Sequence, residues 1–260
     1  MKFGVCDASF DRIPVAIEAG IDYVEMGVSN TLMPLEPEAT FAPVRAKIEA
    51  LAVRPEAFNL FFPGTVRITG PNVDWELVRR YSAVAVQRCA QVGGQSMVIG
   101  SGGARNVPDG FSWDEAWGQL RQAFRIVGEE AAKVGVTIVI EPLRRQESNI
   151  VNYTTEGYRL AQEVNHPNIC VLADFYHMAE LDEPLTNLLE IAPLLRHVHV
   201  ADTGRFRPGS GAYDYAGFMK YLKQTGYNAR ISMEGNWHFE QYGQEVADGL
   251  AFLRKMWAAA

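Results

Sequence analysis

The sequence predicts a single (β/α)8 TIM barrel, because three features of the chain agree on this fold. Short apolar runs alternate with longer helical segments eight times along the chain. Strands that alternate with helices pair in parallel through right-handed crossovers. A chain of 260 residues also matches one closed barrel, which typically takes about 250 residues. Since no linker rich in Pro, Gly or Ser divides the chain, we expect one domain over 1–260.

Each of the eight repeats begins with a short apolar run, as buried parallel strands do. The predicted strands cover 2–6, 23–26, 55–61, 96–99, 136–140, 169–173, 197–201 and 229–233. The predicted helices cover 11–19, 38–51, 73–91, 112–133, 154–165, 183–192, 213–225 and 241–257. Polar residues support three helix starts. Asp74 lies in a first turn, Ser112 fits an N-cap with Glu115 three residues on, and Thr154 or Thr155 can cap the next helix.

The longest irregular segments all follow predicted strands, and they cover 62–72, 100–111, 142–153 and 202–212. Segments that follow strands lie at the C-terminal mouth of such a barrel, which is the face that carries the active site. We therefore expect the functional residues at this mouth.

Composition and charge exclude several classes of partner. The chain has 24 Lys and Arg against 31 Asp and Glu, a formal charge of −7, which argues against nucleic acid and anionic membrane surfaces. No apolar run approaches the ~20 residues of a membrane span, and the N-terminus enters a strand pattern at once rather than a secretory signal. The three cysteines, Cys6, Cys89 and Cys170, are far apart, so we expect reduced thiols and a cytoplasmic location. The sequence leaves a homo-oligomer open.

Four successive strands in the second half end in residues that bind metal ions, namely Glu141, Asp174, His199 and Glu234. An acid directly after an apolar strand is costly to bury unless it is paired or bound to a metal. A single case is more simply a strand-end cap or a core salt bridge, but four successive cases argue against chance. Because neighbouring strands bring their ends together, three carboxylates and one imidazole should converge. A divalent cation would offset their repulsion.

The donor set favours a hard or borderline cation. Oxygen-rich ligation with one nitrogen suits Mn²⁺, Mg²⁺ or Co²⁺, and Zn²⁺ also accepts these ligands. We expect one divalent cation per chain, with Mn²⁺ as the first candidate. His197 lies two residues before His199, so it should point the same way one layer deeper and serve the structure. His177 lies three residues past Asp174, in a predicted loop from which it can reach over the site.

The first half holds weaker candidates. Asn59 ends the third predicted strand, and Glu25 ends the second, where it should face the mouth and bind substrate or pair with an Arg. Phe61 and Phe62 either lie exposed at the mouth, where they would contact a ligand, form a lid or contact another subunit, or, as we prefer, pack in the core under the loop. The segment 101–105 is Gly-rich and ends in Arg105, a pattern that can cradle a phosphate but is too short to establish one.

At these residues the sequence resembles a known family. The segment Glu141-Pro-Leu-Arg-Arg-Gln-Glu147 resembles Glu-x-Leu-Asn-Arg-x-Glu, and the segment that begins at Asp174 resembles Asp-x-x-His-Met. His-x-His at 197–199, Arg205 and Pro-Gly-Ser-Gly at 208–211 complete the pattern with Glu234. Together these motifs resemble the xylose-isomerase-like sugar (phosphate) isomerases and epimerases, and most closely the D-tagatose 3-epimerase and D-psicose 3-epimerase group. Arg144 departs from the Asn common in that group, and the first half of the chain matches less.

The resemblance implies roles for the matched residues. Glu141 and Glu234 would be both metal ligands and the acid and base that move the proton, whereas Asp174 and His199 would be ligands only. His177 and Arg205 would hold a substrate oxygen.

Two further residues are candidates for the same site. Glu147 would hydrogen-bond Glu141 or a substrate hydroxyl, and Asn59 is a candidate substrate-binding residue. As plainer alternatives, Arg205 and Glu147 are solvated loop charges, and the segment 208–211 is a tight turn.

The leading functional hypothesis is a divalent-metal-dependent ketose 3-epimerase. It would work by proton abstraction and return through an enediolate, using two glutamates, on a small sugar or sugar-like ketone. One alternative is an aldose–ketose isomerase of the hydroxypyruvate isomerase type, and another is a metal-dependent lyase or dehydratase on the same barrel. A catalytically silent sugar-binding barrel is a further alternative, although the intact set of four ligands argues against it.

Overall fold

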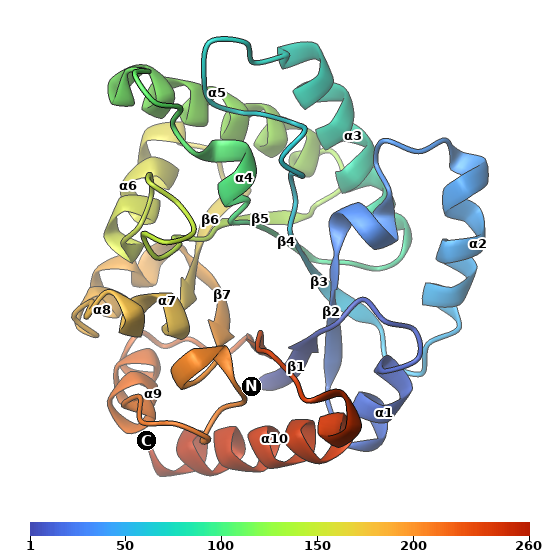
Figure 1. Ribbon diagram of the computed structural model, residues 1–260, viewed down its shortest axis with the longest axis vertical. Helices are drawn as coiled ribbons and strands as arrows, with labels where there is room; N and C mark the ends of the chain where they lie inside the picture. Colours follow the sequence, from blue (N-terminus) through green and yellow to red (C-terminus); the bar gives the residue numbers. More distant parts are fainter.

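The computed structural model describes residues 1–260 and confirms the predicted barrel. Eight strands pair in parallel in sequence order, and β8 closes the barrel by pairing with β1. The strands are β1 (Lys2–Cys6), β2 (Tyr23–Gly27), β3 (Pro55–Asn59), β4 (Ser96–Ile99), β5 (Thr137–Ile140), β6 (Ile169–Asp174), β7 (Leu195–Val200) and β8 (Arg230–Met233). The helices form a ring outside the strands (Figure 1).

Ten α-helices follow or connect the strands, and none of them is both long and apolar enough to cross a membrane. They are α1 (Ile13–Glu18), α2 (Glu38–Glu49), α3 (Trp75–Gln91), α4 (Gly102–Arg105), α5 (Trp113–Ala132), α6 (Thr154–Val164), α7 (Phe175–Glu180), α8 (Asn187–Ile191), α9 (Tyr215–Gln224) and α10 (Tyr242–Ala259). Short 3₁₀- or π-type turns lie at η1 (Val28–Leu32), η2 (Ala192–Leu194), η3 (Thr203–Arg205) and η4 (Phe239–Gln241). The sequence did not predict α4 and α7, which lie in segments that follow strands.

Ser112 is an N-cap as predicted, and Asp74, which the sequence placed in the first turn of its helix, is the N-cap of α3. Asp74 Oδ1 accepts from the backbone N–H of Leu77 at 2.9 Å, and Ser112 Oγ accepts from that of Glu115 at 3.3 Å. The prediction for α6 was wrong, because the helix is capped at Tyr153. Thr154 instead donates its hydroxyl to the buried carboxylate of Glu183 at 2.5 Å.

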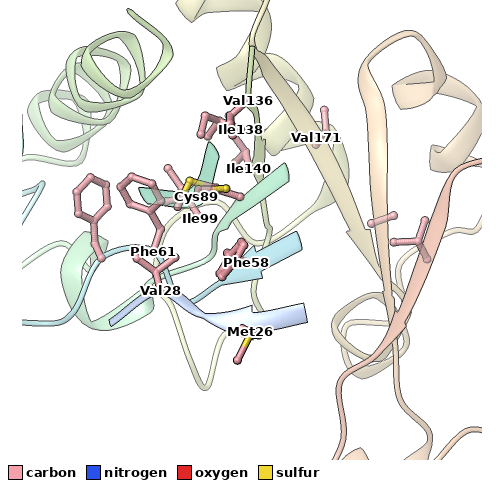
Figure 2. Close-up of a cluster of buried hydrophobic side chains, with 14 of the residues drawn as sticks. Met26, Val28, Phe58, Phe61, Cys89, Ile99, Val136, Ile138, Ile140 and Val171 are labelled. Carbon is pink, nitrogen blue, oxygen red and sulfur yellow. The ribbon is translucent and has the colours of Figure 1, made fainter. Parts of the chain in front are cut away.

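Apolar side chains fill two layers, one inside the barrel and one between the strands and the helices. The inner layer includes Val98, Val139, Cys170 and Leu172. The outer layer is much larger, and Figure 2 shows part of it, including Met26, Phe58, Ile99, Ile140 and Cys89. Neighbouring strand residues such as Val98 and Ile99 divide between the two layers because successive side chains point to opposite faces.

The same alternation directs the four candidate ligands into the barrel mouth. Glu141 lies two residues after Val139, and Asp174 lies two residues after Leu172, so both point inward above the inner layer. His199 follows His197 in the same way on β7. The fold therefore brings these polar groups together at the C-terminal end of the barrel.

The third strand is shorter than the predicted 55–61, because the chain turns directly after Asn59. Leu60 has a φ of 53°, in the left-handed region, and this ends the extended conformation. Phe61 and Phe62 then pack against Tyr81 of α3, with ring centroids 5.8 and 5.5 Å away. Both rings are buried, as the packing interpretation expected.

Candidate active site

Glu141, Asp174, His199 and Glu234 converge at the mouth of the barrel. One ligand atom from each lies within 4.8 Å of the other three. His199 Nδ1 lies 3.2 Å from Glu141 Oε1 and 3.3 Å from Glu234 Oε2. Three carboxylates and an imidazole in this arrangement fit one divalent cation of the oxygen-preferring class.

Burial and neighbouring charges shift the pKa values of the site's ionisable groups in different directions. Burial raises the pKa of Glu141, and the nearby Glu234 adds to this effect, although the hydrogen bond with His199 opposes it. Burial would also raise the pKa of Glu234, but the charges of His199 and Arg205 outweigh it and hold this pKa below its usual range. Burial would lower the pKa of His199, yet the charges of Glu25 and Glu234 hold it well above its usual range. Without a cation, a proton therefore compensates the clustered carboxylates.

Asp174 is fixed by the helix that follows it. Its Oδ1 accepts from the backbone N–H groups of Tyr176 at 2.7 Å and His177 at 3.4 Å, so it caps α7. Its Oδ2 lies 3.5 Å from His177 Nε2. The N-terminal turn of α7 thus orients one oxygen of Asp174 and leaves the other free for the site.

His177 lies in α7 rather than in the loop that the sequence predicted, but it does reach the site. Its side chain is 2% exposed, and neither ring nitrogen has a hydrogen-bond partner. A buried imidazole without partners is costly unless a ligand supplies them. The structure therefore leaves His177 with two polar atoms available at the edge of the ligand cluster.

Arg205 links two acids at the mouth. It donates to Glu147 Oε1 at 3.1 Å and to Glu234 Oε2 at 2.9 Å. Its guanidinium carbon lies 5.2 Å from the ring centroid of Tyr176, within the range of a cation–π contact. The expectation that Arg205 is only a solvated loop charge is wrong.

Glu147 lies beside the cluster, but it does not contact Glu141 as one expectation held. Its carboxylate accepts from Arg144 at 2.9 Å and from Arg205 at 3.1 Å. Arg144 in turn donates to Glu180 at 2.7 Å. Glu147 thus orients two arginines at the mouth.

Asn59 reaches the cluster from the first half of the chain, at the end of β3. Its Nδ2 donates to Glu234 Oε1 at 2.9 Å. Glu234 therefore has one oxygen bound by Asn59 and the other by Arg205. All eight residues predicted for the site lie in or beside this cluster.

Glu25 contacts the cluster from a position that the sequence did not predict. It does not face an Arg at the mouth, but lies fully buried inside the barrel. Its Oε2 is 2.7 Å from His197 Nε2, and its Oε1 is 2.9 Å from His199 Nε2. His197 lies below His199, in the deeper position that the sequence predicted. The sequence feature that could have indicated this buried position is an acid in the middle of the apolar strand Tyr-Val-Glu-Met-Gly.

Gly100, directly after β4, was not recognised from the sequence. A Cβ at this position would lie 2.1 Å from Glu141 Oε2. The absence of a side chain therefore makes room for the carboxylate of Glu141.

Arg105 is not available to the phosphate that the sequence suggested for 101–105, and the backbone cradle in that segment stays a prediction. Arg105 is fully buried and donates to the backbone oxygens of Glu141 at 2.7 Å and Val151 at 3.0 Å. Its guanidinium holds the backbone below the site and does not face a ligand.

Comparisons with known proteins agree with this barrel. The chain is 31% identical over 136 residues to the 3-dehydro-D-guloside 4-epimerase of Escherichia coli (strain K12), and this match covers 52% of each of the two chains. It is 32% identical over 141 residues to the L-ribulose 3-epimerase of Methylomonas sp. (strain DH-1), covering 52% of this chain and 47% of the relative. These matches span about half the length of the relatives.

A solved structure shows the same fold over the whole chain. The D-psicose 3-epimerase of Clostridium cellulolyticum H10, determined with D-tagatose, superposes with a TM-score of 0.86, 18% identity and 99% coverage of both chains. The family described as xylose isomerase-like TIM barrel matches residues 13–256. The chain therefore belongs to the xylose isomerase-like TIM barrel family.

Proposed function

We propose that this protein is a divalent-metal-dependent sugar epimerase, which inverts a carbon next to a ketone carbonyl. The first candidate reaction is inversion at C3 of a ketose whose carbonyl is at C2. One observation carries this proposal: Glu141 and Glu234 offer two carboxylates within one four-donor cluster. They follow β5 and β8, so they approach the centre of the mouth from different strands.

The reaction needs two proton-transfer groups. One carboxylate takes the proton from the carbon beside the carbonyl, the C–H electron pair forms a C=C bond, and the carbonyl electron pair moves to oxygen to give an enediolate. The other glutamate, protonated, returns a proton to the opposite face, and the carbonyl forms again. A divalent cation, when bound, would act as a Lewis acid and stabilise the negative charge on oxygen. Glu141, Asp174, His199 and Glu234 would hold it, with Mn²⁺ as the first candidate.

Two further side chains suit the binding of a substrate oxygen. His177 has two buried ring nitrogens without partners, beside Asp174. Arg205 places a guanidinium next to Glu234, where it would offer hydrogen bonds and positive charge to an oxygen that becomes negative. Asn59 would hold Glu234 in place from the other side and contact the substrate beside it.

The pairing of the arginines favours an uncharged substrate over a sugar phosphate. Arg144 and Arg205 are both occupied by carboxylates, and Arg105 is enclosed by backbone oxygens. A phosphate would have to displace one of these partners. The proposed substrate is therefore a free sugar or a sugar-like ketone.

A second candidate is inversion at C4 of a 3-keto glycoside. The E. coli relative named 3-dehydro-D-guloside 4-epimerase supports it, with 31% identity over 136 residues. The chemistry is the same, because C4 is adjacent to a carbonyl at C3. The two candidates differ in the substrate, in the position of its carbonyl and therefore in which sugar carbon lies between the two glutamates.

Isotope exchange in D₂O tests both candidates. The protein would be incubated with Mn²⁺ and either ketohexoses or a methyl 3-keto-glucoside, and deuterium would be located by NMR. Deuterium at C3 of a ketose supports the first candidate, and deuterium at C4 of the keto-glucoside supports the second. An aldose product with deuterium at C2, together with deuterium at C1 of the recovered ketose, would instead establish an aldose–ketose isomerase. Absence of exchange in every substrate, with Mn²⁺ bound, would contradict the proposal.

A further inference from the structure

We propose that Glu25 is a positioning residue that fixes the ring of His199 with its Nδ1 lone pair toward the cation. This inference rests on the proposed metal site and adds to it a residue outside the four-ligand cluster. Glu25 lies on β2, and it reaches His199 of β7 across the barrel interior.

The hydrogen bonds assign which nitrogen of His199 faces the site. Nε2 lies 2.9 Å from Glu25 Oε1, while Nδ1 lies 3.2 Å from Glu141 Oε1 and 3.3 Å from Glu234 Oε2. A carboxylate only accepts hydrogen bonds, so Nε2 must carry a proton. When the imidazole is neutral, Nδ1 is then the nitrogen with a free lone pair, and it points into the ligand cluster.

Glu25 can perform this task because it is itself held on both oxygens. Oε2 lies 2.7 Å from His197 Nε2 and accepts from Ser232 Oγ at 2.6 Å. The hydroxyl of Tyr23 lies 2.6 Å from the same Ser232 Oγ. Each of these side chains is fully buried. The carboxylate is therefore shielded from bulk solvent, and hydrogen bonds from β7 and β8 fix its position on β2.

The same hydrogen bonds give His197 a positioning role. His197 and His199 donate to the same carboxylate, one to each oxygen, and their rings lie 5.0 Å apart at 79°. A rotated Glu25 would lose both bonds at once. His197 and Ser232 therefore hold Glu25, and Glu25 holds His199.

A competing interpretation makes Glu25 a metal ligand. Cys6, Glu25 and His199 also offer ligand atoms within 4.8 Å of one another. A second cation there would take Nε2 of His199, which is already hydrogen-bonded to Glu25 at 2.9 Å. We therefore expect one cation per chain, on the Nδ1 side.

The main test measures Mn²⁺ affinity by isothermal titration of the metal-free protein. Glu25→Gln keeps the size of the side chain, but its amide has one accepting oxygen for two donating imidazoles. Loss of such a partner typically weakens metal binding about 10- to 100-fold, and we expect a loss in this range. Glu25→Asp keeps the charge but withdraws it by one methylene, so we expect a smaller loss.

Glu56→Gln is the matched control. Glu56 is a buried carboxylate on β3 that pairs with Lys2 and Arg230 at the other end of the barrel. Its loss should leave Mn²⁺ affinity unchanged. Wild-type affinity in a folded Glu25→Gln protein would overturn the inference, as would binding of two cations per wild-type chain. Failure of the wild-type protein to bind Mn²⁺ would instead refute the proposed function.

A second measurement needs no variant, so it tests the positioning role of Glu25 even if neither Glu25 variant folds. A crystal structure of the Mn²⁺-loaded protein, with the ion located by anomalous scattering, should place the ion on His199 Nδ1. Glu25 should remain hydrogen-bonded to Nε2. An ion bound to Nε2 or to Glu25 would overturn the inference.

Discussion

Arg205 donates a hydrogen bond from Nη2 to Glu234 Oε2 at 2.9 Å, and Nη1 of the same guanidinium donates to Glu147. The charge of Arg205 is one cause of the lowered pKa of Glu234. The guanidinium therefore both orients a proposed acid–base residue and favours its ionised form. A planar group with donors in a fixed fork suits this double contact, and an ammonium does not.

We predict that Arg205→Lys lowers kcat/KM for the substrate by about 100-fold, the lower end of what loss of one preorganised donor costs. The lysine keeps the charge, but it cannot reach both acids from one position. Steady-state kinetics on the substrate found in the D₂O experiment would measure the effect. Arg207→Lys is the matched control on the same loop, because Arg207 contacts Asp248 at 3.6 Å and the backbone oxygen of Pro208 at 3.5 Å, and neither contact involves the cluster. Equal kinetics for the two variants would show that Arg205 has no special role.

We predict that Glu141→Gln and Glu234→Gln each abolish turnover. An amide of the same size cannot take or return the proton, and each change also removes a carboxylate ligand. Deuterium exchange and bound Mn²⁺ should be measured on the same samples, so that loss of metal is separated from loss of chemistry. Glu183→Gln controls for removal of a buried carboxylate, since Glu183 bonds Thr154 and Asn187. Near-full activity in either active-site variant would exclude the two-glutamate mechanism.

The sequence predicted the four-ligand cluster because local rules suffice for it. Each ligand lies at or next to the C-terminal end of a short, largely apolar strand, and the alternation of strand side chains sets the direction in which it points. Eight strand–helix repeats predict a closed barrel, in which the ends of neighbouring strands lie side by side. Glu141 and Asp174 come together in this way, from β5 and β6. No long-range contact had to be known in advance.

The depth of Glu25 and the arginine partners of Glu147 were not predicted, because they depend on contacts far along the chain. Glu25 ends the same kind of apolar run, but its partner His199 is 174 residues away across the barrel. Glu147 pairs with Arg205, which is 58 residues away. The local sequence pattern shows neither how deep Glu25 lies in the barrel nor which of several arginines pairs with Glu147.

We predict that Mn²⁺ affinity rises with pH. The pKa of His199 is well above its usual range in the metal-free site, so below that pKa the ring is protonated on both nitrogens. The raised pKa of Glu141 acts in the same direction. A cation must displace these protons, and its affinity therefore increases as pH rises toward the raised pKa values.

Titration calorimetry between about pH 6 and about pH 8, a range that spans the ordinary histidine pKa of about 6.5, checks this prediction. Buffers with different ionisation enthalpies should reveal protons released on binding. A dissociation constant that does not change with pH, with no proton release, would contradict protonation of the metal-free site.

We predict that Gly100→Ala weakens Mn²⁺ binding and turnover while the barrel stays folded. The new Cβ would lie 2.1 Å from Glu141 Oε2 and 3.0 Å from its carboxyl carbon, closer than van der Waals contact allows. The carboxylate is the movable end of a side chain, so it should shift away while the backbone remains in place. Calorimetry with Mn²⁺ would measure the affinity, and thermal unfolding of the metal-free protein would measure the stability.

Gly118→Ala is the control for this change, because Gly118 lies in α5 and its nearest neighbour would be Arg121 Nη2 at 3.9 Å. Alanine favours a helix over glycine by up to about 1 kcal/mol, so this variant should be as stable as the wild type or more so, with unchanged Mn²⁺ affinity. Wild-type affinity in Gly100→Ala would mean that Glu141 binds the cation from another position. A folded Gly100→Ala protein with weakened binding would instead show that the missing side chain at Gly100 is a requirement of the metal site and not of the barrel.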